Sequence, residues 1–269
     1  MIYLNLKGGL GNMMFQIAAV KSFSIQKKTD YSFPNLPSHI RYLSSETQYN
    51  PKVNYCSEYL NLPFLKNTKT QHPFLPVEVV TFPFHYEKIQ INSSSIMVDG
   101  FFQSEKYFHE HEEQILEMFS PDENILNFLN SKYSELLNQR TTSIHVRRGD
   151  YVKHSEHHFV QQMDYFNQSM EMLDSKTDKF LVFSDDLDWC KENFKGEKFV
   201  FIENERDYYE MYLMSLCTNN ITSNSSFSWW GAWLNKNKDK VVVGPQNWFG
   251  NALQSLKTED IIPDNWIRL

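Results

Sequence analysis

The sequence predicts an α/β protein with largely parallel sheets, because short apolar runs alternate with longer stretches of helical periodicity along most of its 269 residues. This length allows one large domain or two compact ones. A boundary near 138–142 is expected to separate two αβ halves with a cleft between them. The expected strands are 2–6, 96–102, 142–146, 179–184, 198–202, 220–222 and 240–244, and the expected helices are about 12–27, 104–118, 122–139, 161–174, 205–217 and 227–237.

The first strand runs into a glycine-rich turn, "KGGLGNMM", before the first helix. Gly9 and Gly11 fit the start of a dinucleotide-binding fingerprint, but Met14 stands where its third glycine belongs, and no P-loop is present. A strand, a glycine turn and a helix N-terminus still suit an anionic ligand, since helix-terminal amides attract negative charge. A tight turn without a ligand is an equally good interpretation of this stretch alone.

The region from Thr29 to Ser95 is rich in Pro, Asn, Ser and Tyr and has weak periodicity. We expect it to be irregular, with room for small helices, and to supply substrate-specific loops. Beyond it, Ser120-Pro121-Asp122 predicts a helix start with proline at the first helical position.

The strand in "TTSIHVRRGDYV" brings two arginines to its carboxyl end, where open α/β sheets bind ligands. Alternation places His145 and Arg147 on one face. Arg147 and Arg148 are suited to hold phosphate oxygens through charge-assisted hydrogen bonds. The alternative is an ion pair with Asp150 at the surface.

Two further strand ends carry polar residues. In "VFSDDLDW", Asp186 and Asp188 match the short D-x-D pattern of cation-dependent sugar transferases, but a helix-capping role for one of these carboxylates is the favoured interpretation. In "ITSNSSFSWWGAWL", a helix is expected to begin near Ser226 and to offer a second anion site. Its tryptophans are expected to pack that helix.

Composition excludes some classes. The formal net charge of −7 disfavours broad electrostatic binding to nucleic acid. Cys56, Cys190 and Cys217 form no metal-binding pair and are expected to be reduced, packed thiols. Because no signal peptide or membrane-spanning run is apparent, a cytoplasmic location is expected.

Several segments together resemble a known family. The stretches "GGLGNMMFQIA", "GFFQSEKYF", "HVRRGDYV", "FSDD", "LMSLCTNNITSNSSFSWWGAWLN" and the tail "IIPDNWIRL" are similar, in consistent order, to the bacterial galactoside α-1,2-fucosyltransferases of glycosyltransferase family 11. The resemblance implies a GT-B fold, with two Rossmann-like halves facing across a cleft. Residues 1–140 would form the acceptor-side domain, and residues 141–269 the domain that binds GDP-fucose, with the C-terminal tail packing back on the first half.

The same resemblance implies inverting transfer of L-fucose from GDP-β-L-fucose to the 2-hydroxyl of a terminal galactoside, without an obligatory metal or other cofactor. It implies that Arg147 binds the β-phosphate. Glu210 occupies the position of a guanine-reading carboxylate, with Asp207 as the fallback because Asp is common there. The other implied donor contacts are Gly11, Asn12, His145, Asp185, Ser225, Ser226 and Phe227.

The general base is the least determined role. Asp150 is the catalytic candidate because it follows the phosphate site closely in sequence. The loop after it, "HSEHHF", contains His154, Glu156, His157 and His158, and a solvated loop is the expected interpretation for most of these histidines.

Two alternatives remain open at this level: a fucosyltransferase of another linkage, such as α-1,6, and an inactive nucleotide-sugar-binding partner. The extended "SSFSWWGAW" segment favours the α-1,2 group. The expected partners are GDP-fucose and a galactose-terminated glycan, with no nucleic acid. If the acceptor is lipid-linked, we expect peripheral association with the inner face of the membrane.

Overall fold

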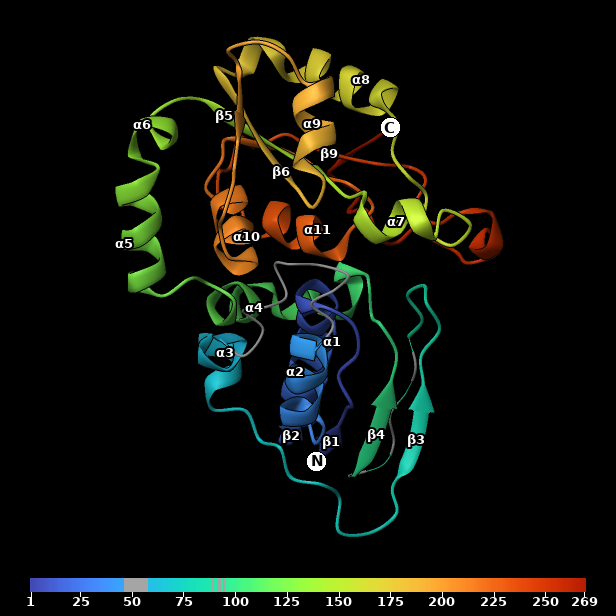
Figure 1. Cartoon of the computed structure of the whole chain (residues 1–269). Helices are drawn as coiled ribbons and strands as arrows, with labels where there is room; N and C mark the ends of the chain where they lie inside the picture. The colour runs from blue at the N-terminus through green and yellow to red at the C-terminus, as the bar shows by residue number, and fades with distance from the viewer. Residues whose placement is uncertain (46–57, 89, 91–92, 94) are drawn as a thin grey trace. The chain divides into compact units, whose positions relative to one another are not determined.

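The chain forms two compact units, shown in the computed structural model of Figure 1, which describes residues 1–45, 58–88, 90, 93 and 95–269. The first unit comprises Met1–Ser120 with Leu256–Pro263, and the second Pro121–Ser255 with Asp264–Leu269. Each unit contains one sheet, and the strands of both sheets pair in parallel. The α/β class with parallel sheets is therefore confirmed.

The first unit is built on a sheet with the strand order β2-β1-β4-β3. Its strands are β1 (Ile2–Tyr3), β2 (Tyr31–Ser32), β3 (Glu78–Thr81) and β4 (Ile96–Asp99), with β3 and β4 side by side (Figure 1). Its helices are α1 (Leu10–Lys27), α2 (Leu36–Ser45), α3 (Pro63–Lys66) and α4 (Glu112–Met118), and the 3₁₀ turns η2 (Glu105–Tyr107) and η3 (His109–His111) precede α4.

Helix α1 is the central element of the first unit. Met13, Met14 and Phe15 are fully buried, and the apolar character continues around the helix, as expected for a helix enclosed on most sides. Phe23 meets Phe102 edge to face, with ring centroids 5.9 Å apart. Such aromatic pairs add about 0.5–1.5 kcal/mol beyond the area that they bury.

The tail segment 256–263 is part of the first unit. Asp260 accepts hydrogen bonds from the Tyr86 amide at 3.1 Å and from the Lys106 ammonium at 2.5 Å. Ile261 and Ile262 are buried beside this anchor. The chain then returns to the second unit at Asp264 and adds its last strand to the sheet there.

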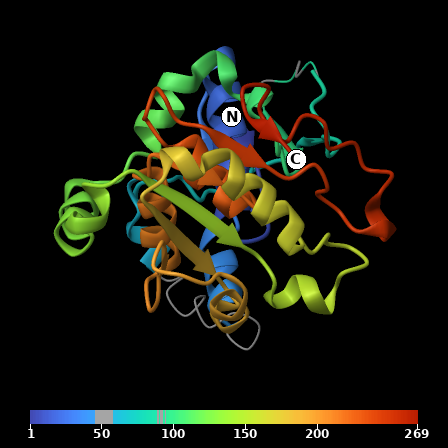
Figure 2. The same cartoon turned by 90° about the horizontal axis from the view of Figure 1, so that it is seen from above.

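The second unit contains a six-stranded sheet with the order β10-β9-β8-β5-β6-β7. Figure 2 shows β5 and β6 running side by side in the same direction. The strands are β5 (Thr141–Val146), β6 (Lys179–Ser184), β7 (Phe199–Phe201), β8 (Asn219–Ile221), β9 (Val242–Gly244) and β10 (Ile267–Arg268). The helices are α5 (Glu123–Lys132), α6 (Ser134–Leu137), α7 (Gly149–Lys153), α8 (Met163–Leu173), α9 (Leu187–Asn193), α10 (Asp207–Ser215) and α11 (Ser226–Trp233), with the 3₁₀ turns η4 (Asp174–Lys176) and η5 (Asn251–Leu253).

Both faces of this sheet are buried, as parallel sheets require. Ile144 and Val182 join one core cluster with Phe166 of α8, whereas the alternating residues Leu181 and Phe183, also fully buried, point to the opposite face. In α11, Trp229 and Trp230 are fully buried, Trp233 is nearly so, and Trp229 also packs against Trp266 of the tail. The expectation that these tryptophans pack the helix is confirmed.

The predicted elements correspond well to those of the second unit and less well to those of the first. The strand at 179–184 has the predicted ends, but the strand predicted at 2–6 stops at Tyr3 because the chain leaves the sheet for the glycine turn. Asp122 caps α5 by accepting the Ile125 amide, so Pro121 precedes the cap and is not the first helical residue as predicted. The 29–95 region contains β2, α2, α3 and β3 among its described residues.

The compact units divide after Ser120, whereas the sequence places the boundary at residue 140. Two contacts explain this difference: α5 meets α10 of the second unit, and Tyr133, the residue after α5, meets the segment just before α10. The Phe128 ring stacks on Tyr209 at 4.7 Å, and Tyr133 donates a hydrogen bond to Glu205 at 2.9 Å. These contacts group residues 121–140 with the C-terminal sheet.

Cys190 and Cys217 are buried free thiols, as expected, and burial raises the pKa of each to about 12. Cys56 lies outside the described residues. Among the helices that the structure describes, none combines the length and the apolar character needed to cross a membrane.

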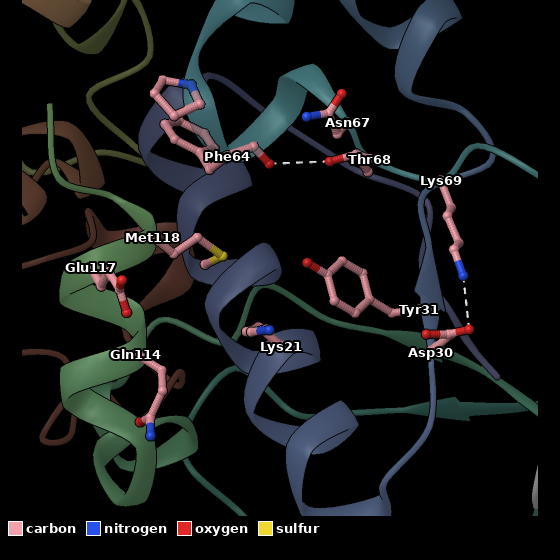
Figure 3. Close-up of a pocket in the computed structure, with 11 residues that line it drawn as sticks. Lys21, Asp30, Tyr31, Phe64, Asn67, Thr68, Lys69, Gln114, Glu117 and Met118 are labelled. Atoms are coloured by element: carbon pink, nitrogen blue, oxygen red, sulfur yellow. Dashed lines mark hydrogen bonds and ion pairs between the residues drawn. The ribbon is translucent and has the colours of Figure 1, made fainter. Parts of the chain in front are cut away.

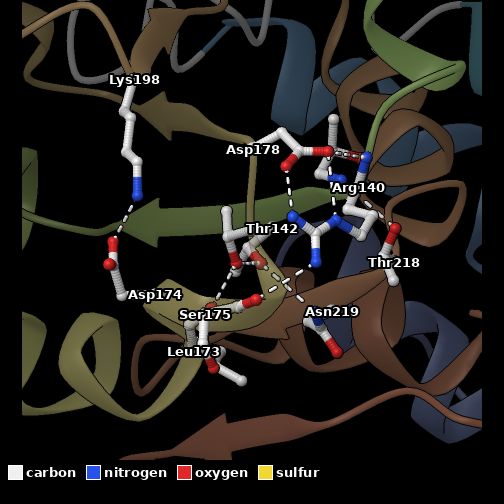
Figure 4. A network of polar contacts seen from close by, with 11 residues as sticks. Arg140, Thr142, Leu173, Asp174, Ser175, Asp178, Lys198, Thr218 and Asn219 are labelled. Carbon is white, nitrogen blue, oxygen red and sulfur yellow. Dashed lines mark hydrogen bonds and ion pairs between the residues drawn. The ribbon is translucent and has the colours of Figure 1, made fainter.

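The amino ends of β5 and β6 are joined by a polar network centred on Arg140 (Figure 4). Its guanidinium donates to both carboxylate oxygens of Asp178, at 2.5 and 3.2 Å, and to the Ser175 carbonyl at 3.1 Å. The Asp178 amide donates to the Arg140 carbonyl at 2.7 Å. The hydrogen bond from Arg140 is the main reason that the pKa of Asp178 lies below its usual value.

Because the folded-state pKa of Asp178 is lowered, its ion pair with Arg140 stabilises the fold above the pKa of the unfolded carboxyl, near 3.9. That contribution is lost as the pH falls through the lower folded-state value. We therefore expect Arg140→Gln to lower the urea midpoint at pH 6, and the difference from the wild-type chain to shrink toward pH 3.5. The contribution is small because the pair is exposed. A difference that stays constant across this range would contradict the assignment.

Candidate active site

Three neighbouring strands of the second unit end in polar segments at one edge of the sheet. Because β8, β5 and β6 are adjacent and parallel, their carboxyl ends lie together. Strand β5 leads to Arg147 and Arg148, β6 leads to Asp185 and Asp186, and β8 leads to the serine-rich segment 222–226. Ligands of open α/β sheets bind at such an edge.

Arg147 is held between two carboxylates. One guanidinium nitrogen lies 2.7 Å from Asp150 Oδ1, and the other terminal nitrogen lies 3.0 Å from Asp185 Oδ2. Burial acts to lower the pKa of Arg147, but the charges of Asp185 and Asp150 raise it above its usual value. The guanidinium is therefore always charged, and its plane is fixed by two partners. The ion pair with Asp150 was one of the two alternatives left open by the sequence.

Asp185 organises the turn after β5. Its Oδ1 accepts the Arg148 amide at 2.9 Å, while Oδ2 contacts Arg147. Gly149 makes this approach possible, because a Cβ at that position would lie 2.6 Å from Asp185 Oδ2. The glycine of the R-R-G-D segment thus leaves space for a carboxylate from the neighbouring strand end.

Arg148 points to a different partner. Its Nε donates to Asp186 Oδ2 at 3.0 Å, and its guanidinium lies 4.1 Å from the ring centre of Trp189. Asp186 also caps α9 by accepting the Trp189 amide at 3.3 Å, which confirms the capping expectation for one of these carboxylates. Asp188 is exposed. Within the described part of the chain, no three His, Cys, Asp or Glu side chains are grouped as a metal ion needs.

His145 and the start of α11 form the third part of this edge. The His145 ring is nearly buried, with Nδ1 2.7 Å from the Ser223 hydroxyl and its centre 5.6 Å from the Phe227 ring. Ser225 occupies the N-cap position of α11, but its side chain makes no capping hydrogen bond. The amides that follow, from Ser226 on, lack intrahelical acceptors and point toward any anion bound there.

A stacked pair covers the other side of Arg147. The Tyr151 and His158 rings are nearly parallel at 4.2 Å, and the Tyr151 hydroxyl donates to the Asn224 carbonyl at 3.1 Å. Burial is the main cause that lowers the pKa of His158 and raises that of Tyr151 to about 12. The backbone of His158 also forms an isolated antiparallel β-bridge with that of Phe249. This histidine is therefore structured and mostly neutral at pH 7.

Sequence analysis missed Asn224 as an organising residue. Its side-chain amide donates to the carbonyls of Phe159 and Trp248, both at 2.8 Å, and so joins two loops beside the serine-rich segment. The available signal was the asparagine itself in the serine-rich segment, because a buried Asn side chain needs hydrogen-bond partners. The partners, however, are 65 and 24 residues away and are not visible in sequence.

Glu210 lies in the first turn of α10, the helix that follows β7, and is buried. The fallback residue Asp207 begins the same helix, and its carboxylate accepts the Tyr208 amide at 2.7 Å. Both carboxylates therefore lie in the first turn of the same helix, where Glu210 is buried and Asp207 makes a local hydrogen bond.

The glycine turn of the first unit is held from several sides. Gly8 has φ of +71°, a conformation that favours glycine, and a Cβ there would lie 2.3 Å from the Asn12 amide nitrogen. Asn12 Oδ1 accepts a hydrogen bond from Gln103 at 2.5 Å. Gly11 is buried within the first turn of α1. By contrast, the space above Gly9 is open.

Three polar side chains that sequence analysis missed pin this turn. Gln16 exchanges two hydrogen bonds of 2.9 Å with the Lys7 backbone, and Asn35 exchanges two, of 2.8 and 2.9 Å, with the Leu6 backbone. His39 Nε2 lies 2.8 Å from the Gly8 carbonyl. Backbone groups that leave a sheet need such partners, so the glutamine five positions after Gly11 was the available signal.

The formal charges at the edge of the second unit do not leave an excess of positive charge. Arg147 and Arg148 contribute two positive charges, and Asp150, Asp185 and Asp186 contribute three negative ones, which leaves one net negative charge. An anion that binds Arg147 would therefore have to displace a carboxylate.

Two α/β units, each with a parallel sheet, are the construction of the GT-B class of glycosyltransferases that the sequence predicted. The chain belongs to glycosyl transferase family 11, whose family model matches residues 1–269. The resemblance noted in the sequence is thus confirmed at the level of the family.

Two Escherichia coli relatives align over the whole chain. The O-antigen biosynthesis glycosyltransferase WbnK is 30% identical, with all of both chains covered, and an alpha-1,2-colitosyltransferase is 31% identical, covering 100% of this chain and 98% of the relative. Human galactoside alpha-(1,2)-fucosyltransferase 1 is 25% identical over 55% of this chain and 45% of its own length. The crystal structure of POFUT1 in its apo form shares the fold, with a TM-score of 0.50, 12% identity and coverage of 90% and 97% of the two chains.

Asp185 and Asp188 provide a matched pair for testing the geometry. Asp185→Asn removes a charge that both Arg147 and the Arg148 amide use, so we expect it to lower the free energy of unfolding by about 1–3 kcal/mol. Exposed Asp188→Asn is expected to change it by less than about 0.5 kcal/mol. Urea denaturation of both variants measures the contrast, and equal losses would show that Asp185 does not organise this turn.

Proposed function

We propose that this chain transfers L-fucose from GDP-β-L-fucose to the 2-hydroxyl of a terminal galactoside, with inversion at the sugar. The observation that carries this proposal is the oriented Arg147 at the end of β5 in a chain of glycosyl transferase family 11. The names of two relatives, an alpha-1,2-colitosyltransferase and a galactoside alpha-(1,2)-fucosyltransferase, support the linkage.

The chemical step explains why an arginine is needed. The acceptor oxygen forms a bond to the sugar carbon while the bond to the β-phosphate breaks, and GDP departs with the electron pair. Negative charge therefore grows on the β-phosphate while the sugar becomes cationic. A guanidinium fixed in advance stabilises that charge without rearranging, which is the main source of catalysis in such sites. We assign this role to Arg147 and propose that no metal is required.

Other residues are proposed to bind the donor. Ser225 is the N-cap of α11 but makes no side-chain capping hydrogen bond, so the backbone amides of Ser226 and Phe227 can donate to a phosphate. The His145 ring lies beside Phe227. Asp185 acts through Arg147 and is a positioning residue. Glu210 is proposed to read the guanine, and Gly11 and Asn12 of the first unit to contact the fucosyl diphosphate.

Asp150 is proposed to accept the acceptor proton. In this structure its carboxylate is engaged with Arg147. A phosphate that takes over this side of the guanidinium would release Asp150, while Asp185 keeps the other side. Donor binding would thereby supply a free carboxylate at the moment when the acceptor hydroxyl must lose its proton.

The identity of the transferred sugar has a second candidate. The relative that is 31% identical over the whole chain is a colitosyltransferase. Transfer of colitose from its nucleotide-activated form is therefore the competing function. The phosphate and nucleotide contacts proposed above are the same for both sugars. The two candidates differ in the contacts around the sugar ring.

Arg147→Lys tests the central assignment. Lysine keeps the charge that Asp150 and Asp185 need but loses the planar fork, so we expect the fold to persist and transfer to fall by roughly 10²- to 10³-fold. The rate is measured as release of GDP with a galactoside acceptor. Near-native turnover in this variant would remove Arg147 from the mechanism.

Asp150→Asn is the companion variant. Loss of transfer with preserved GDP-fucose affinity is expected of a base, and Asn no longer competes as an anion for Arg147. A loss of donor affinity instead would make Asp150 a structural partner of the arginine.

Thermal unfolding with GDP-fucose, GDP, UDP-galactose and no ligand, each with EDTA, tests the donor class and the absence of a metal requirement. A ligand at about 100 times its Kd stabilises the fold by about 2.7 kcal/mol. We expect a shift with the guanosine ligands alone that EDTA leaves unchanged. A shift that needs a divalent cation, or one that favours the uridine sugar, would overturn the donor assignment.

A further inference from the structure

The first unit contains a cavity that the proposed transfer chemistry does not use. It has a volume of about 480 Å³ and lies among α1, α3, α4 and the edge strand β2 (Figure 3). This volume is within the range of small-molecule sites, roughly 300–1,000 Å³. Its lining combines polar side chains from four elements with the apolar Phe64 and Met118.

One wall of the cavity is fixed by the segment beside β2. The Ser32 hydroxyl lies within hydrogen-bond distance of the Lys69 and Gln71 carbonyls, at 3.0 and 2.8 Å, and the Phe33 amide donates to Lys69 at 2.9 Å. The Lys69 ammonium pairs with Asp30 at 2.8 Å. The segment 67–71 therefore cannot move away from the strand without losing several contacts.

The opposite wall is held by aromatic packing. Phe64 of α3 meets Phe119, just after α4, edge to face with centroids 4.8 Å apart. The Thr68 hydroxyl donates to the Phe64 carbonyl at 3.1 Å. The cavity is thus preformed, and a ligand would not have to order its walls on binding.

Several polar side chains that line this cavity have no partner within the part of the chain that the structure describes. The Tyr31 hydroxyl is directed toward Met118 and away from the Asp30–Lys69 pair (Figure 3). Burial raises the pKa of Tyr31, so its hydroxyl stays neutral and offers both a donor and an acceptor. The other such groups are Lys21, Asn67, Gln114 and Glu117.

The charges of the cavity argue against an anionic ligand. Asp30 and Lys69 neutralise each other, and Lys21 and Glu117 carry one charge of each sign. A phosphate would therefore find no excess of positive charge. A mixture of amides, a phenol, an ammonium and a carboxylate matches a ligand with many hydroxyl groups, since each hydroxyl both donates and accepts. Met118 offers an apolar surface for the C–H groups of such a ligand.

We propose that this cavity binds a neutral oligosaccharide and, resting on the proposed function, that this oligosaccharide is the galactose-terminated acceptor. Lys21 lies eleven residues along α1 from Leu10, roughly 16 Å from the glycine turn at a rise of 1.5 Å per residue. The cavity is thus separate from Gly11 and Asn12 at the start of α1. A second contact with a long glycan raises the effective concentration of the acceptor.

The experiment uses the full chain with ¹³C-methyl-labelled methionine and no donor. The Met118 resonance is assigned by Met118→Leu among the ten methionines of the chain. Titration with lacto-N-tetraose is expected to shift the Met118 methyl signal in a saturable manner. Inorganic phosphate is expected to leave it unchanged.

Tyr31→Phe is expected to raise the Kd for lacto-N-tetraose about 2- to 10-fold, the effect of one lost hydrogen bond. Tyr42→Phe is the matched control, because Tyr42 is an exposed phenol of the same unit that does not line the cavity, and its Kd should not change. A silent Met118 signal, a response to phosphate, or equal effects of the two variants would overturn the inference. Because no donor is present, failure of this binding experiment leaves the proposed transfer function untouched. An enzyme that shows the Met118 shift but transfers no fucose would refute the proposed function and leave the cavity inference standing.

Discussion

The parallel pairing of β5 with both β6 and β8 is the constraint on which the candidate site depends. It brings three chain segments, separated by up to about 80 residues, to one edge of the sheet. Arg147 from the first segment then meets Asp185 from the second, and His145 meets Ser223 from the third. A slip of one residue in either register would turn these side chains to the opposite face. The apolar residues that alternate with them fix the register by burial.

The candidate site is rigid because its charged groups are already paired. Arg147 has two carboxylate partners and Arg148 has one, with Trp189 beside it. Such pairing keeps half-buried charges from destabilising the fold, since an unpaired charge in this environment is costly. It also means that an anion could reach Arg147 only by replacing one of its carboxylate partners.

The two units differ in how far the sequence predicted them. In the second unit the strands are buried or half-buried and each carries apolar residues, so β5 to β9 were all expected within two residues of their ends. In the first unit, β2 has two residues and β3 is largely exposed, so neither produces a hydrophobic pattern. The short helix α7 was also missed, because it begins directly after a strand end where turn residues dominate. For α9 the sequence indicated only a capping carboxylate, and the structure identifies it as Asp186.

The sequence by itself determined the fold class, the family, the arginines at the end of β5 and the helix start at Ser226, because apolar periodicity and local turn chemistry act between near neighbours. Only the tertiary structure decided which carboxylate each arginine meets, since Asp185 lies 38 residues from Arg147 and is chosen by strand order. The same holds for the pinning of the glycine turn by Asn35 and for the cavity around Tyr31. Hydrogen bonds and cavities form between surfaces that packing brings together, and that packing depends on the whole chain.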